Sequence, residues 1–120
     1  MFDHVGFNVG DLERSRAFYL AALAPLGVKV LREGERFMVI GGPSGRLWIG
    51  CMGAAATPIH FAFRADDRGA VDAFHKAAVA AGGGDNGAPG LRPNYGPDYY
   101  AAFVHDPDGH NVEAVTYAPA

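Results

Sequence analysis

Two histidines and one glutamate have the residue types and surroundings needed to bind a divalent metal ion. His4 and His60 each stand in a short apolar segment rich in strand-forming residues, and Glu113 stands in the otherwise apolar segment 111–115. A carboxylate in such a segment needs a partner, because an unpaired buried charge is costly. Two imidazoles and one carboxylate suit Fe, Mn, Ni, Co or Zn in the divalent state, with positions left for water or substrate. We therefore expect a metal site of the catalytic type.

An internal repeat supports this grouping. A shift of 56 positions places His4 on His60 and Phe18 on Phe74, and the order of strand, acidic cap, helix and glycine stop recurs in both halves. The chain is thus expected to be one domain, 1–120, made of two repeats at about 1–56 and 57–120. Two histidines then occupy the same place in two copies of one unit.

Towards the end of each half the shift becomes 64, which sets Ile49 opposite Glu113. Four equivalent positions therefore read His4, Ile49, His60 and Glu113. Strand side chains alternate between faces, so Trp48 is expected on the face opposite Ile49, packed against a helix.

The helices and strands that position these residues can be predicted from the hydrophobic periodicity and from the capping and turn residues. Helices are expected at 12–23 and 68–81, each after an aspartate that can cap its first turn. Strands are expected at 2–9, 28–32, 36–40, 46–52, 59–65, 98–105 and 110–117. This order gives an α+β fold of two βαβββ modules. Glycine and proline recur through 84–97, which we interpret as a long loop with at most a short extended piece.

A rival cluster of metal-binding residue types occurs near the C-terminus. His105, Asp106 and His110 flank the turn 106–109, and His110 has the opposite strand parity to Glu113. We interpret these residues as solvated turn residues.

Composition bounds the class of protein. The chain has 120 residues, 10 Lys plus Arg against 13 Asp plus Glu, and a formal net charge of -3. That balance argues against nucleic acid or an anionic membrane surface as the partner. Cys51 is the only cysteine, the N-terminal residues lack the features of a secretory signal, and no apolar segment is long enough to span a bilayer. A cytoplasmic protein is expected.

Side chains for contact with a small substrate are found mainly in the segment 91–100. Tyrosines there could act in acid–base steps, stacking or hydrogen bonding, and an arginine could bind an anionic group. The candidate catalytic residues are Tyr95, Tyr99 and Tyr100, and the candidate substrate-binding residues are Arg92, Asn94 and Arg64, the last on the same strand face as His60. Packing at a strand edge is the alternative role for the tyrosines and for Arg64.

The segments 4–9, 11–19, 59–63 and 106–113 together resemble the vicinal oxygen chelate superfamily, which includes glyoxalase I, bleomycin-resistance proteins, fosfomycin-resistance enzymes and extradiol dioxygenases. The segment Asp-Pro-Asp-Gly-His-Asn-Val-Glu at 106–113 is the most specific piece. The resemblance implies a cupped mixed sheet, a homodimer, and a divalent metal bound by His4, His60 and Glu113.

The resemblance also implies a chemistry. Such enzymes bind a small substrate through two adjacent oxygens on the metal and carry out lyase, isomerase or dioxygenase reactions. Glyoxalase I has a further liganding glutamate, and its place falls on Ile49 in the repeat alignment, so little glyoxalase I activity is expected. The alternative is a metal-free protein of the bleomycin-resistance kind that sequesters a small molecule or drug.

Overall fold

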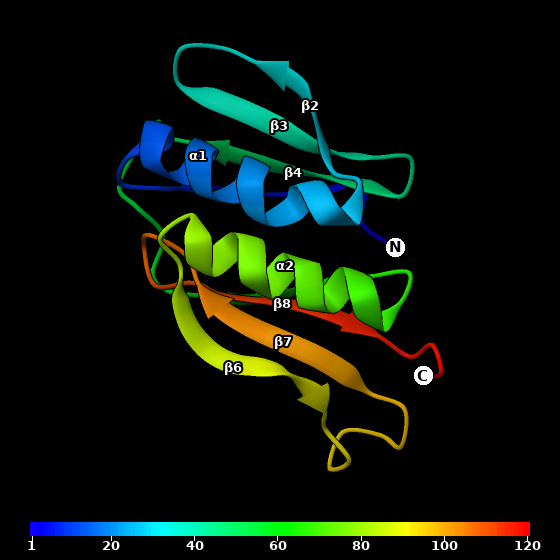
Figure 1. Cartoon of the computed structure of the whole chain (residues 1–120). Coiled ribbons are helices and arrows are strands. Elements are labelled where there is room, and N and C mark those ends of the chain that lie inside the picture. Colours follow the sequence, from blue (N-terminus) through cyan, green and yellow to red (C-terminus); the bar gives the residue numbers. More distant parts are fainter.

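A computed structural model describes all 120 residues and confirms the two βαβββ modules (Figure 1). The first module contains β1 (His4–Asn8), α1 (Leu12–Leu23), the short 3₁₀ helix η1 (Ala24–Leu26), β2 (Lys29–Glu33), β3 (Phe37–Gly42) and β4 (Gly45–Gly50). The second contains β5 (His60–Arg64), α2 (Arg68–Ala80), β6 (Gly84–Leu91), β7 (Tyr100–His105) and β8 (Asn111–Thr116). Neither helix has the length and apolar character of a membrane span.

Each module forms its own four-stranded mixed sheet. Sheet A has the order β1-β4-β3-β2 and sheet B the order β5-β8-β7-β6. The first strand of each module pairs in parallel with the last, and the remaining pairs are antiparallel. As a result β1 and β5, which carry His4 and His60, are both edge strands, and no ladder joins the two sheets within the chain.

The predicted helix caps are confirmed. The side chain of Asp11 accepts a hydrogen bond from the backbone N–H of Arg14 at 3.2 Å, and Asp67 accepts one from Ala70 at 2.8 Å. Each contact satisfies an N–H group that has no partner inside its helix. α1 and α2 lie side by side, and each covers one face of a sheet (Figure 1).

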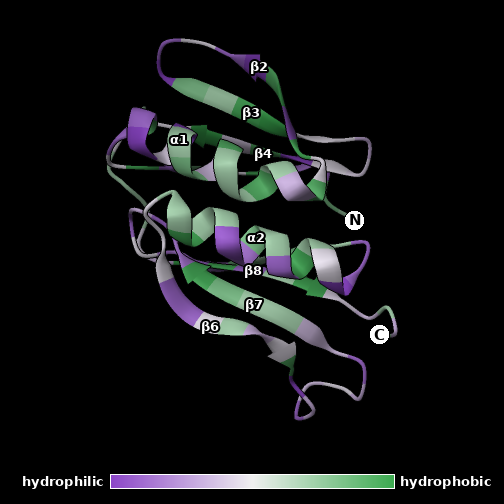
Figure 2. Cartoon of the chain, in the orientation of Figure 1, coloured by the Kyte–Doolittle hydropathy of each residue, from purple (hydrophilic) through white to green (hydrophobic).

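The segment 84–97 is not a long loop, because its first eight residues form β6 and pair with β7. The backbone makes these hydrogen bonds without needing apolar side chains, and Figure 2 shows β6 as paler and more hydrophilic than β7 and β8. Pro89 is tolerated because β6 is an edge strand with irregular pairing. The loop proper is the short connection that follows Leu91.

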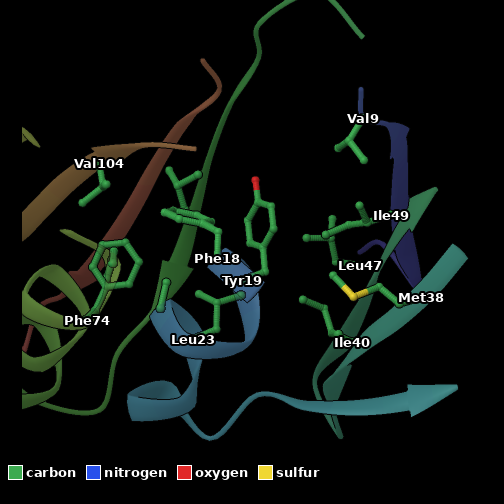
Figure 3. Close-up of a cluster of buried hydrophobic side chains, with 14 of the residues drawn as sticks. Val9, Phe18, Tyr19, Leu23, Met38, Ile40, Leu47, Ile49, Phe74 and Val104 are labelled. Carbon is green, nitrogen blue, oxygen red and sulfur yellow. The ribbon is translucent and has the colours of Figure 1, made fainter. Parts of the chain in front are cut away.

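A single cluster of 19 buried hydrophobic residues draws from both modules. In Figure 3 the α1 side chains Phe18, Tyr19 and Leu23 lie between sheet A residues on one side and Phe74 and Val104 on the other. The helices therefore face this core, and the opposite face of each sheet is left open.

Asp106 and His110, at the turn 106–109, are buried, so their interpretation as solvated turn residues was wrong, whereas His105 is exposed as expected. Asp106 is 5% exposed and His110 fully buried. Asp106 accepts hydrogen bonds from the Tyr19 hydroxyl at 2.5 Å and from the backbone N–H groups of Asp108 and His110 at 2.9 and 2.8 Å. Three donors on one carboxylate make it a structural group.

Candidate functional site

The open face of sheet B gathers polar and aromatic side chains around Glu113. His60, Ala62 and Arg64 alternate with core residues along β5, and Ala62 is paired with Glu113 on β8. Phe103 on β7 is paired with Glu113 from the other side. Strand alternation therefore places His60, Glu113 and Phe103 on one face, as the sequence predicted for the first two.

His60 and Glu113 are in direct contact. His60 Nε2 lies 3.1 Å from Glu113 Oε1, and the Glu113 side chain is 2% exposed against 51% for that of His60. His60 Nδ1 lies 3.0 Å from the Asn111 carbonyl oxygen, which can only accept, so Nδ1 carries a hydrogen. In the neutral ring, Nε2 then presents a lone pair to a carboxylate. The two atoms are therefore placed so that they can share a cation.

Tyr99 completes the surroundings of this carboxylate. Its hydroxyl donates a hydrogen bond to Glu113 Oε2, the oxygen that does not face His60. Burial, and then the hydrogen bond to Glu113, raise the pKa of the Tyr99 hydroxyl above its ordinary value. Tyr99 therefore remains a neutral donor at neutral pH. Its ring is held edge-on by Tyr95 and Tyr117, at centroid distances of 5.3 and 5.4 Å.

Two candidate arginines are on the same face. The Arg92 guanidinium lies 5.4 Å from the centre of the Phe103 ring and donates to the carbonyls of Gly90 and Ala88 at 2.9 and 2.8 Å. Arg64 lies 5.8 Å from the centre of the Tyr117 ring. Neither arginine forms an ion pair with an acidic residue.

The remaining candidates in this segment differ in position. Tyr95 and Asn94 are exposed in the turn before β7. Tyr100 is on the opposite face of the sheet from Glu113, because its hydroxyl donates to Asp72 of α2 at 2.7 Å. The structure thus brings Tyr99 to Glu113 and turns Tyr100 away from it, as strand alternation requires for adjacent residues.

His4 lies on sheet A, apart from His60 and Glu113. Its Nδ1 is 2.8 Å from Asp3 Oδ1, and both Asp3 oxygens accept from Arg46 at 2.6 Å. The hydrogen bond from His4, and then that from Arg46, lower the pKa of the Asp3 carboxyl. Because Nδ1 donates to the carboxylate, the neutral ring leaves Nε2 free. Within one chain no group of three or more His, Cys, Asp or Glu side chains comes together to hold a metal.

The equivalence drawn between Ile49 and Glu113 was wrong by one residue. Gly6 pairs with Trp48 just as its repeat equivalent Ala62 pairs with Glu113. Trp48 is therefore the structural equivalent of Glu113, and Ile49 is fully buried in the core. A slip of one residue reverses the face of every side chain in a strand, which is why the alignment gave the wrong residue.

Trp48 is accordingly on the open face of sheet A and does not pack against a helix. Its indole lies nearly parallel to the ring of Phe37, with 12° between the planes and 6.4 Å between the centroids. Both side chains are half-buried. The sequence analysis missed this pair, although the alternation of Arg46, Trp48 and Gly50 could have placed Trp48 on the face of His4.

A groove of about 720 Å³ runs between the open edges of the two modules. It is lined by β1, β4 and β5, together with residues around η1 and the β3–β4 turn. Its wall includes the apolar residues Val5, Leu47 and Phe61 and the polar residues His60 and Arg64. Its lining follows β5 from Ile59 past His60 to Arg64.

Comparison with known proteins agrees with this architecture. The model of the Glyoxalase/Bleomycin resistance protein/Dioxygenase superfamily matches residues 1–114. A glyoxalase/bleomycin resistance protein from Albidiferax ferrireducens T118 is 34% identical, with 99% of each chain covered and a TM-score of 0.85. A putative glyoxalase from Bacillus halodurans is 26% identical over 97% of this chain and 95% of its own, with a TM-score of 0.76. No curated protein sequence gives a significant match.

The chain therefore belongs to the Glyoxalase/Bleomycin resistance protein/Dioxygenase superfamily. A lactoylglutathione lyase from Agrobacterium tumefaciens, 20% identical over 97% of this chain and 92% of its own with a TM-score of 0.73, shares the fold. A glyoxalase I mutant from Zea mays is 25% identical over 94% of this chain, which spans 43% of that protein, with a TM-score of 0.71.

Proposed function

We propose that this protein is a small homodimeric metalloenzyme that binds a divalent ion through His60 and Glu113 of one chain and His4 of a second copy. The observation that carries the proposal is the contact of His60 Nε2 with the buried Glu113 carboxylate at 3.1 Å. Two acceptor atoms held face to face are a suitable donor set for a divalent cation. The hydrogen bond from His60 Nδ1 to a backbone carbonyl is the outer contact that orients metal-binding histidines.

The proposed second copy follows from the sheet edges. β1 and β5 are both edge strands with one side unpaired, and a symmetric partner would cover that side. His4 and His60 have equivalent places in the two modules, so β1 of one chain beside β5 of another would bring His4 to the face that holds Glu113. His4 is suited to this role because its Nε2 is free while Asp3 binds its Nδ1.

The proposed reaction acts on a small substrate that chelates through adjacent oxygens, in lyase, isomerase or dioxygenase chemistry. A bound divalent ion would supply Lewis acidity for an oxyanion developing on the substrate. Tyr99 fixes Glu113 Oε2, so Oε1 is presented beside His60. Tyr99 is also a neutral hydroxyl donor next to the proposed metal site. Arg64 and Arg92, which have no acidic partners, could bind an anionic part of the substrate.

Metal binding tests the proposal directly. Purified protein is stripped of metal, offered Fe(II), Mn(II), Ni(II), Co(II) or Zn(II) separately, and assayed for bound metal per chain. About one equivalent is expected, and His4→Ala, His60→Ala or Glu113→Ala should lower the affinity by an order of magnitude or more. Tyr100→Phe is the matched control on the opposite face. If no metal binds, the His60–Glu113 contact is an ion pair, and the alternative of a metal-free sequestering protein is favoured.

A further inference from the structure

The indole of Trp48 lies flat over a floor made by two glycines. A Cβ atom added at Gly50 would come within 2.2 Å of Trp48 Cη2, and one added at Gly6 within 3.2 Å of Trp48 Cβ and Cε3. The ring thus occupies space that side chains at either position would fill. One face of the indole is turned to the backbone of β1 and β4, and the other is turned to the open side of sheet A.

Phe37 and Arg32 extend this surface across sheet A. Phe37 lies nearly parallel to Trp48, and the Arg32 guanidinium carbon lies 5.5 Å from the centre of the Phe37 ring. Arg32 forms no ion pair, although the adjacent Glu33 is bound by Arg16 at 2.7 Å. A row of two flat rings ending in an unneutralised cation is therefore available. We call Trp48, Phe37 and Arg32 the aromatic platform.

The geometry points to a ligand: we propose that the aromatic platform binds a planar aromatic ring that carries a carboxylate or similar anionic group, with the ring stacked on Trp48. A ring held flat loses little freedom when a second ring stacks on it, and aromatic pairs add favourable energy beyond area burial. Arg32 supplies the complementary charge for the anionic group.

The platform lies on the same strand face as His4, since Gly6, which pairs with Trp48, is two residues after His4 on β1. A ring stacked there would be brought to the proposed metal site. In assigning this ring to the substrate, the inference rests on the proposed function. The preference of sheet A for aromatic anions can be measured separately, because that measurement needs no metal.

The experiment uses benzoate as the probe and metal-stripped full-length protein. Cyclohexanecarboxylate keeps the charge of benzoate but lacks a flat ring, and benzyl alcohol keeps the ring but lacks the charge. Calorimetry or ligand-observed NMR gives the three affinities, and benzoate should bind more tightly than either. Trp48 is the only tryptophan, so a fluorescence change that saturates with benzoate places the ligand at the platform.

Variants test the named residues. Trp48→Leu should weaken benzoate binding by roughly three- to tenfold, while Trp48→Phe should keep most of it. Arg32→Gln should reduce the preference for benzoate over benzyl alcohol. Val79→Ala, at an exposed position on α2, is the control and should change nothing. Circular dichroism establishes that each variant is folded, and Trp48→Phe keeps the test valid if the leucine variant is unstable.

The inference is overturned if benzoate and cyclohexanecarboxylate bind equally, or if folded Trp48→Leu binds benzoate as well as the parent does. A fluorescence change that follows protein concentration but not benzoate would assign the ring to contact with a second copy, which also overturns it. Failure of the proposed function has a different signature, because metal binding would be absent while the benzoate preference remains. Metal affinity in Trp48→Leu should be unchanged.

Discussion

The hydroxyl of Tyr19 in α1 donates a 2.5 Å hydrogen bond to the carboxylate of Asp106 in the turn before β8. This buried contact crosses from the first module to the second. A neighbouring contact also joins the two modules. The backbone N–H of Gly10 donates a hydrogen bond to the Asp108 carboxylate at 3.2 Å. The most family-specific segment of the sequence therefore has a structural role in this chain, since it holds the modules together and sets the start of the strand that carries Glu113.

Replacing Tyr19 by phenylalanine should lower the free energy of unfolding by about 1 to 3 kcal/mol, because one oxygen of a buried carboxylate loses its donor. Urea denaturation of the parent and the variant measures the difference. Tyr117→Phe is the matched control, since the Tyr117 side chain is half exposed and its hydroxyl forms no hydrogen bond within the chain. Equal losses in both variants would contradict a special role for the Tyr19–Asp106 contact.

The same contact predicts a loss of stability in alkali. Burial, and then the Asp106 charge, raise the pKa of Tyr19 in the folded chain. The unfolded chain loses this proton near pH 10, so the contribution is complete below that pH and declines as the pH rises further. The free energy of unfolding of Tyr19→Phe should fall less steeply between about pH 10 and 11 than that of the parent. Parallel curves from urea titrations in that range would exclude this linkage.

A mixture of two variants that each bind little metal distinguishes a metal site shared between two chains from a metal site within one chain. His4→Ala retains His60 and Glu113, whereas Glu113→Ala retains His4. If each proposed site joins residues of two chains, a heterodimer of the variants contains one intact site and one doubly defective site. Heterodimers isolated from the mixed and refolded protein should then bind about half the metal of the parent homodimer, while each variant alone binds little. No recovery in isolated heterodimers would place the site elsewhere.

Sequence reasoning was accurate where a local pattern sets the structure. The helix after Asp11 begins and ends as predicted, and the His60 and Glu113 strand faces followed from alternation. It failed at β6, because an edge strand held by backbone pairing needs no apolar pattern. It failed again at Ile49, because alignment of two divergent strands cannot fix a register to one residue. Asp106 is bound by Tyr19 of α1 and His110 packs against Phe7 of β1, and no local pattern encodes these contacts with the other module.

The corrected register predicts opposite effects for two neighbouring glutamate substitutions. Ile49→Glu puts a carboxylate into the fully buried core and should destabilise the fold by several kcal/mol. Trp48→Glu puts the carboxylate on the open face of sheet A, the face that also carries His4. This variant should fold and should bind a divalent ion more tightly than the parent. Thermal unfolding and metal titration of both variants measure these effects. A stable Ile49→Glu protein with raised metal affinity would restore the original equivalence.

Trp48 also bears on glyoxalase I activity, which we expect to be very low in this protein. The position equivalent to Glu113 in the first module has an indole, which can neither bind a metal ion through oxygen nor accept a proton from a substrate. Loss of a positioned general base costs about 10²- to 10⁴-fold in rate. The test is turnover of the hemithioacetal of methylglyoxal and glutathione by metal-loaded parent, Trp48→Glu and the size control Trp48→Gln. Activity should rise only in Trp48→Glu, because glutamine matches its length without the carboxylate. Robust turnover by the unmodified protein would show that this chain carries out the reaction without a carboxylate at position 48.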